Sequence, residues 1–176
     1  MADHGQVGHH KRGMNQIYLD CDGVLADFDA VAERLFHMPS RLAQEKLGNQ
    51  VFWKRIRGAG HFYRNLPLIP DAMELFNAVA HLRPIILTGV PAGGWAEEEK
   101  IAWAAEHFPG VTIVTCRAKE KFLHVRHPGD VLVDDYLKFK HLWEEAGGVF
   151  IHHTSARGSV ERLSELGFDV RLSPGL

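Results

Sequence analysis

Short apolar runs alternate with helical patterns over most of this 176-residue chain, and this order is the strongest constraint on its fold. Runs of strand length lie at residues 16–19, 84–87, 111–115, 131–133 and 149–151, with a weaker one at 169–172. They are continuous rather than alternating in polarity, which is typical of parallel strands buried on both faces. Helical patterns separate them, at residues 71–81, 95–107, 120–126, 136–145 and 159–166. We therefore predict an α/β fold built on a doubly wound parallel sheet.

One region interrupts the alternation. After the first strand no further strand pattern occurs before residue 69, and helical stretches cover residues 29–37, 40–47 and 50–57. An insertion at this point should lie above the carboxyl edge of the sheet, where it can close over a ligand. The predicted organisation is a polar, flexible lead-in (1–14), a core (15–28 and 69–176) and a small helical cap (29–68).

The bulk composition is that of a soluble globular protein, with 45% hydrophobic and 24% charged residues. A net charge of -2 argues against nucleic acid or an anionic membrane as a partner, since such proteins normally carry a basic face. The polar first residues lack the apolar stretch of a signal peptide. Cys21 and Cys116, the two cysteines, show no paired spacing pattern. We therefore expect a cytoplasmic protein.

Polar side chains follow the predicted strands where they end. They are Asp20 and Asp22 after the first, Thr88 and Gly89 after the second, Lys119 and Lys121 after the third, and Asp134 and Asp135 after the fourth. If the strands are parallel, these groups meet at one edge of the sheet. Several carboxylates packed together repel, so a cation is expected among them. All-oxygen ligands without clustered His or Cys favour Mg²⁺.

The spacing of Asp20 and Asp22 fits two separate chemical roles. A lysine, a threonine hydroxyl and backbone N–H groups beside a cation form a cradle for a phosphoryl group. Within it, Asp20 can attack phosphorus directly. Asp22 can protonate the departing oxygen and later take a proton from water. The alternative is a solvated Asp-Gly turn without chemistry.

These motifs, in this order, resemble a known superfamily. The segments DCDGVLADF, ILTG and GDVLVDD, with a lysine between the last two, look like the haloacid-dehalogenase superfamily of Mg²⁺-dependent phosphatases. Within it the chain is most similar to the 5'(3')-deoxyribonucleotidases, and residues 60–72 also resemble that family. The resemblance implies a Rossmann-like core and hydrolysis of small phosphomonoesters through an aspartyl-phosphate, with deoxyribonucleoside monophosphates first among them.

Carried over by position, the resemblance implies Asp20 as nucleophile and metal ligand. It implies Asp22 as acid/base with its backbone carbonyl on the metal, Thr88 as phosphate ligand, and Asp135 as metal ligand with Asp134 beside it. Lys121 is favoured over Lys119 as the phosphate-side lysine, and the choice stays open.

Two aspects of substrate binding also stay open. Gly89 stands where the family tends to have Ser, which removes one hydroxyl from the phosphate side. Phe28, Phe62 and Tyr63 are candidates for a base-binding wall, with core packing as the equal alternative.

Two other functions compete with this prediction. The same chemistry on another small phosphoester, such as a sugar phosphate, fits the motifs as well. A non-catalytic metabolite-binding relative is the alternative from a different class. The predicted partner is a small phosphomonoester, with no nucleic acid and no membrane, and a homodimer is one alternative for the oligomeric state.

Overall fold

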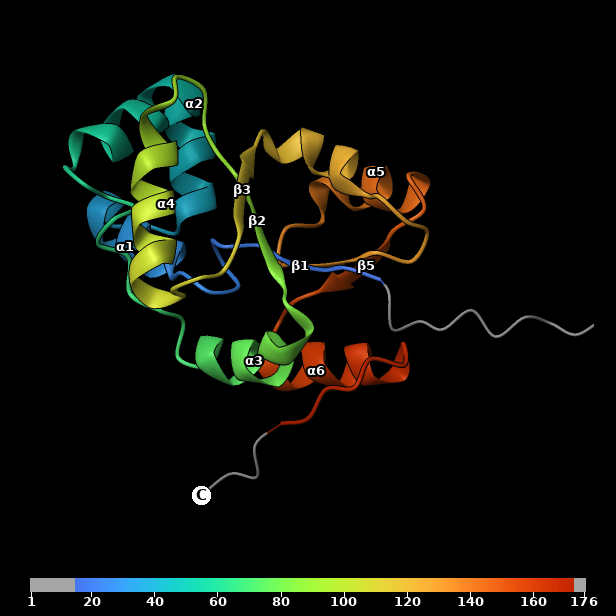
Figure 1. Cartoon of the computed structure of the whole chain (residues 1–176). Coiled ribbons are helices and arrows are strands. Elements are labelled where there is room, and N and C mark those ends of the chain that lie inside the picture. The colour runs from blue at the N-terminus through green and yellow to red at the C-terminus, as the bar shows by residue number, and fades with distance from the viewer. Residues whose placement is uncertain (1–14, 173–176) are drawn as a thin grey trace, which may run out of the picture.

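A five-stranded, all-parallel sheet forms the centre of the computed structural model, which describes residues 15–172 (Figure 1). Its strands are β1 (Ile17–Leu19), β2 (Ile85–Gly89), β3 (Ile113–Cys116), β4 (Val131–Asp134) and β5 (Val149–His152). Their order across the sheet is β3-β2-β1-β4-β5. This confirms the predicted α/β fold with a parallel sheet. The predicted lead-in lies outside the described residues.

The pairing of the strands places β1 between β2 and β4. Leu19 is in register with Ile86 on one side and with Val133 on the other. The ladder continues past β1, because Asp20 N donates to Val133 O over 2.9 Å. The carboxyl ends of β1 and β4 are thereby held side by side, so the residues that follow these strands meet.

Helices cover the two faces of the sheet unequally. On one face α3 (Ala72–Val79), α4 (Trp95–His107) and α6 (Ala156–Glu165) form the larger apolar core. On the other face α5 (Lys140–Glu145) and the short 3-10 helices η3 (Ala118–His124) and η4 (Leu137–Phe139) cover a smaller cluster. Figure 1 shows α3 and α6 together on one side of the sheet and α5 on the opposite side. Burial on both faces explains why the strands read as continuous apolar runs.

Two helices follow the first strand, in the segment predicted as a cap. They are α1 (Phe28–Phe36) and α2 (Ser40–Gly58), and the stacked rings of Phe36 and Phe52 join them at 4.8 Å between centroids. Helix α2 is kinked at Gly48, whose φ of 77° is outside the helical range. The kink falls in the predicted gap between residues 47 and 50, where glycine can adopt this conformation without steric cost.

Three sequence predictions need correction. Residues 169–172 form no strand. Val170 and Leu172 pack on the large core instead. A contact between His81 Nε2 and Asp169 O holds this segment against the 3-10 helix η2 (Ala80–Leu82). The predicted α-helix at 120–126 is the 3-10 helix η3, and that at 136–145 is split into η4 and α5. Among the described residues, no helix has the length and apolar character needed to cross a membrane.

Trp103 joins α4 to the backbone at Leu66, near the end of the segment predicted as a cap. Its ring is 1% exposed, and Nε1 donates to Leu66 O over 2.8 Å. Trp103→Ala leaves a cavity and an unpaired carbonyl, so we expect a loss of about 3–5 kcal/mol in the free energy of unfolding. Urea unfolding followed by far-UV circular dichroism measures it.

The matched control is Ile101→Ala on the same helix. Ile101 is 47% exposed, so its truncation should change stability by no more than about 0.5 kcal/mol. Equal losses in the two variants would show that Trp103 does not anchor this segment.

Candidate active site

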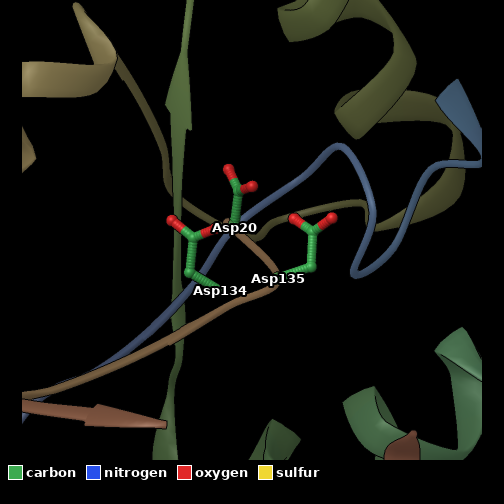
Figure 2. A group of neighbouring side chains, drawn as sticks. All are labelled: Asp20, Asp134 and Asp135. Atoms are coloured by element: carbon green, nitrogen blue, oxygen red, sulfur yellow. The ribbon is translucent and has the colours of Figure 1, made fainter. Parts of the chain in front are cut away.

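Three carboxylates gather where β1 and β4 end. Asp20 follows β1, Asp134 is the last residue of β4, and Asp135 follows it. One oxygen from each lies within 4.8 Å of the others. Figure 2 shows the three side chains converging from these two segments. Asp20 and Asp134 are buried, and Asp135 is half-buried. We refer to these three residues as the carboxylate cluster.

Lys121 on η3 forms ion pairs with two members of the cluster. Its Nζ lies 2.7 Å from Asp20 Oδ1 and 2.8 Å from Asp134 Oδ2, and all three side chains are buried. Burial alone would lower the pKa of Lys121, but the two carboxylates outweigh it and raise the pKa above the usual lysine range. Lys121 is therefore a permanent positive charge within the site.

One ammonium does not balance three carboxylates. Burial and, next to it, the negative charge of Asp20 raise the pKa of Asp134 and that of Asp135 to about 7. The groups that converge here are oxygen donors that a hard cation accepts. The carboxylate cluster can therefore hold a metal ion, which would offset the remaining negative charge.

Gly23 makes room for this arrangement. Its φ is +83°, and a Cβ atom at this position would lie 2.2 Å from Asp135 Oδ2. The turn that carries it is closed by backbone bonds from Val24 N and Leu25 N to Cys21 O, over 3.3 and 2.8 Å. The glycine of the DCDG sequence is thus required both for the turn and for the place of Asp135.

Asp22 stands apart from the carboxylate cluster. Its Oδ2 accepts from Lys100 Nζ over 2.5 Å, and the side chain is 25% exposed. Burial raises the pKa of Asp22, and the charge of Lys100 opposes that shift. The predicted contact of the Asp22 backbone carbonyl with a metal stays a prediction.

Thr88 and Gly89, at the end of β2, lie in different surroundings. Thr88 is fully buried, and its Oγ1 accepts from Lys100 Nζ over 2.9 Å. Gly89 lines the cavity described below. A Cβ atom at Gly89 would lie 3.0 Å from Ala118 Cβ, so the close approach of η3 explains glycine where the resemblance leads one to expect serine.

A cavity of about 380 Å³ opens beside the carboxylate cluster. Asp20, Asp22, Asp134, Asp135 and Lys121 reach it, and its walls combine aromatic side chains (Phe28, Trp53 and Tyr63) with cationic ones (Arg41, Arg117 and Lys119). Phe62 is buried and is not among the lining residues, and its ring packs against Phe28 at 5.3 Å. Of the two candidate lysines, Lys121 contacts the carboxylates, while Lys119 is exposed at the cavity wall.

Lys100 has no role in the sequence-based prediction, although its position carries a signal. Helix α4 buries Ala96, Lys100, Trp103 and Ala104, which repeat at the spacing of one helix face. A lysine inside such an apolar stripe needs buried acceptors, because an isolated buried ammonium is costly. That requirement points to a carboxylate at the same place.

Comparison with solved structures shows which known fold this chain shares. No protein-family model matches the chain, and no curated protein matches it either. An L-2-haloacid dehalogenase from Xanthobacter autotrophicus is 16% identical, with 91% of this chain and 84% of that one covered and a TM-score of 0.55. A hydrolase from Streptococcus pneumoniae TIGR4 is 14% identical, with 85% and 98% covered and a TM-score of 0.53.

A hydrolase from Pseudomonas syringae is 12% identical, with 86% of this chain and 99% of that one covered and a TM-score of 0.52. At such identities the similarity is one of fold. The chain therefore has the haloacid-dehalogenase fold, as its motifs predicted, and the narrower resemblance to nucleotidases stays a prediction.

The raised pKa values make metal affinity depend on pH. Asp134 and Asp135 hold protons below about pH 7, and a metal ion must displace them, so binding should tighten as pH rises. For each carboxyl that titrates there, we expect about a tenfold gain in Mg²⁺ affinity between pH 6 and pH 8. Isothermal titration calorimetry in two buffers of different ionisation enthalpy measures the affinity and the released protons. Affinity that does not change over this range would contradict the assignment.

Gly23→Ala should push Asp135 out of the carboxylate cluster. The new methyl group collides with the Asp135 carboxylate, so we expect Mg²⁺ affinity to fall about 10–100-fold. Gly110→Ala is the matched control, since Gly110 has a φ of +80° and nothing within 4 Å of a Cβ atom. It carries the same backbone strain without the collision. Equal metal affinity in the two variants would show that Gly23 does not set the position of Asp135.

Proposed function

We propose that this chain is a Mg²⁺-dependent phosphomonoesterase that forms an aspartyl-phosphate on Asp20. The observation that carries the proposal is that Asp20 belongs both to the carboxylate cluster and to the cavity lining. Asp22 reaches the same cavity from the next turn. A nucleophile, an acid/base residue and a cation site thus share one space.

The first step transfers the phosphoryl group to the protein. A carboxylate oxygen of Asp20 attacks phosphorus, and the bond between phosphorus and the leaving-group oxygen breaks. The electron pair stays on that oxygen, which receives a proton from Asp22. Lys121 donates a hydrogen bond to Oδ1 of Asp20. This contact orients the carboxylate so that its other oxygen attacks.

The second step frees the protein. Asp22, now a carboxylate, takes a proton from a water molecule that attacks the phosphorus of the aspartyl-phosphate. The bond between phosphorus and the Asp20 oxygen breaks, inorganic phosphate leaves, and Asp20 returns to its charged form. Asp22 is protonated again, so the cycle closes without another reactant.

In this proposal Asp20, Asp134 and Asp135 would hold the Mg²⁺ ion, together with the Asp22 backbone carbonyl that the resemblance implies. When bound, the ion supplies the positive charge that lets an anionic phosphoester approach an anionic nucleophile. Oxygen-only donors support magnesium over softer metals. Gly89 lines the cavity and remains a candidate for contact with the phosphate. The predicted phosphate contact of Thr88, whose side chain is fully buried beside Lys100, would need this side chain to become accessible.

The walls of the cavity support a phosphoester with an aromatic leaving group. The rings of Phe28, Trp53 and Tyr63 offer stacking surfaces. Deoxyribonucleoside monophosphates are the substrates that we place first, and sugar phosphates are the alternative. The neighbour named an L-2-haloacid dehalogenase suggests dehalogenation as another reaction, but an anionic haloacid has no need of two further carboxylates beside the nucleophile. A non-catalytic binding module would not need Asp22 in addition to Asp20.

Release of inorganic phosphate tests the proposal. The substrates are dUMP, dTMP, dGMP, 3'-monophosphates, ribonucleotides, sugar phosphates and an aryl phosphate, each with Mg²⁺ and with EDTA. We expect metal-dependent release that is fastest from deoxyribonucleotides. Asp20→Asn removes the nucleophile and should reduce the rate by at least about 10³-fold.

Asp169→Asn is the matched control, because Asp169 is exposed and far along the chain from the site. It should keep wild-type activity. Release from sugar or aryl phosphates alone would keep the mechanism and reject the substrate class. No release from any ester, together with no acyl-phosphate trapped on Asp20, would refute the proposal.

A further inference from the structure

Lys100 is a charged side chain inside the core of α4. It is 1% exposed, and its Nζ lies 4.5 Å from the centroid of the Tyr63 ring. A buried ion pair seldom improves stability over well-packed apolar residues, since both charges lose their water. An apolar residue in this stripe would pack as well, so the lysine is better explained by what it contacts.

Every proton of the Lys100 ammonium has an acceptor. Nζ lies 2.5 Å from Asp22 Oδ2, 2.9 Å from Thr88 Oγ1 and 2.9 Å from Gly89 O. Two of these acceptors belong to the end of β2 and are fixed by the sheet. Lys100 therefore ties the Asp22 carboxylate, which lies on the turn after β1, to a rigid strand.

The two oxygens of Asp22 differ in their surroundings. Oδ2 is held by Lys100, whereas Oδ1 is buried and has no hydrogen-bond partner among the described residues. Oδ1 itself is closed off from the cavity in this conformation. The Asp22 side chain is nevertheless 25% exposed and lines the cavity, so the carboxylate that Lys100 holds lies beside the leaving group of a bound ester.

The two acids of the first motif have separate lysines. Lys121 pairs with Asp20 and Asp134, while Lys100 pairs with Asp22. Neither lysine forms an ion pair with both Asp20 and Asp22. Lys100 therefore holds the Asp22 carboxylate through contacts that do not include the carboxylate cluster.

The geometry points to Lys100 as a positioning residue, which holds the Asp22 carboxylate through Oδ2 at the cavity, where that carboxylate exchanges the proton with the leaving-group oxygen. This inference rests on the proposed function. It predicts that loss of Lys100 harms the esters whose leaving group needs a proton. An alkoxide needs one, whereas p-nitrophenolate departs without it.

The experiment compares benzyl phosphate, an alkyl ester, with p-nitrophenyl phosphate in the full chain with Mg²⁺. The value of kcat/KM covers only the steps up to departure of the leaving group. For Lys100→Met we expect kcat/KM to fall about 100-fold or more with benzyl phosphate and less than about 10-fold with p-nitrophenyl phosphate. Lys46→Met, an exposed lysine on α2, is the matched control and should leave both values unchanged. Equal losses with the two esters would mean a merely structural role and would overturn the inference.

A double-mutant cycle with Asp22→Asn covers the case in which Lys100→Met fails to fold. The double variant buries no unpaired carboxylate. If Lys100 acts through Asp22, adding Lys100→Met to Asp22→Asn should change kcat/KM with benzyl phosphate less than threefold, by roughly the margin of additive effects. A further loss of 100-fold would overturn the inference.

Crystal structures separate this inference from the proposed function. If the wild type hydrolyses neither ester, the proposed function fails. The role of Lys100 in holding Asp22 is then still tested by comparing the position of the Asp22 carboxylate in crystal structures of the wild type and the variants. The Asp22 carboxylate should leave its place beside Thr88 in Lys100→Met and keep it in Lys46→Met. A carboxylate that stays in place in Lys100→Met would overturn the inference.

Discussion

Electrostatic repulsion at the carboxyl edge of the sheet is the constraint on which the site depends. Three carboxylates with oxygens within 4.8 Å of one another cannot all be charged without a compensating cation. Lys121 supplies part of that charge through two buried ion pairs. Burial and the negative charge of Asp20 raise the pKa of Asp134 and that of Asp135 to about 7. The positions of β1, β4 and η3 therefore create a site that a bound cation would stabilise.

Close approach of the backbone makes this crowding feasible. Gly23 lets the turn after β1 pass beside Asp135, and Gly89 lets the end of β2 pass beside Ala118 at the start of η3. A side chain at either place would separate two segments that carry charged groups of the site. The first glycine belongs to the DCDG motif, whereas the second replaces a residue that the resemblance leads one to expect. The loss of a serine hydroxyl at Gly89 is thus matched by a packing requirement.

Sequence patterns predict the strand ends well, because continuous apolar runs fix both the parallel sheet and the residues that follow it. The choice between Lys119 and Lys121 does not follow from the pattern, since it depends on the helix type. In the 3-10 helix η3, residues three apart share a side, so Lys121 lies on the side of Ala118, which packs on Gly89. The run at 169–172 fails as a strand because Val170 and Leu172 pack on the large core without pairing with a strand of the sheet. Phe62 is also ambiguous in the sequence, since a buried aromatic residue can support a cavity wall without reaching the cavity.

Helix α4 connects the backbone at Tyr63 and Leu66, the end of the segment predicted as a cap, with the residues at the edge of the sheet. Glu99 accepts from Tyr63 N over 3.0 Å, and Trp103 Nε1 donates to Leu66 O over 2.8 Å. Between these two contacts Lys100 reaches Asp22, with the Tyr63 ring beside its ammonium. Three neighbouring positions of one helix thus hold the end of this segment and the acid of the first motif. Helix α4 therefore links the cavity wall at Tyr63 to the Asp22 carboxylate. A ligand seated against that wall lies near a carboxylate whose position depends on α4 and the end of β2 as well as on the turn that carries it.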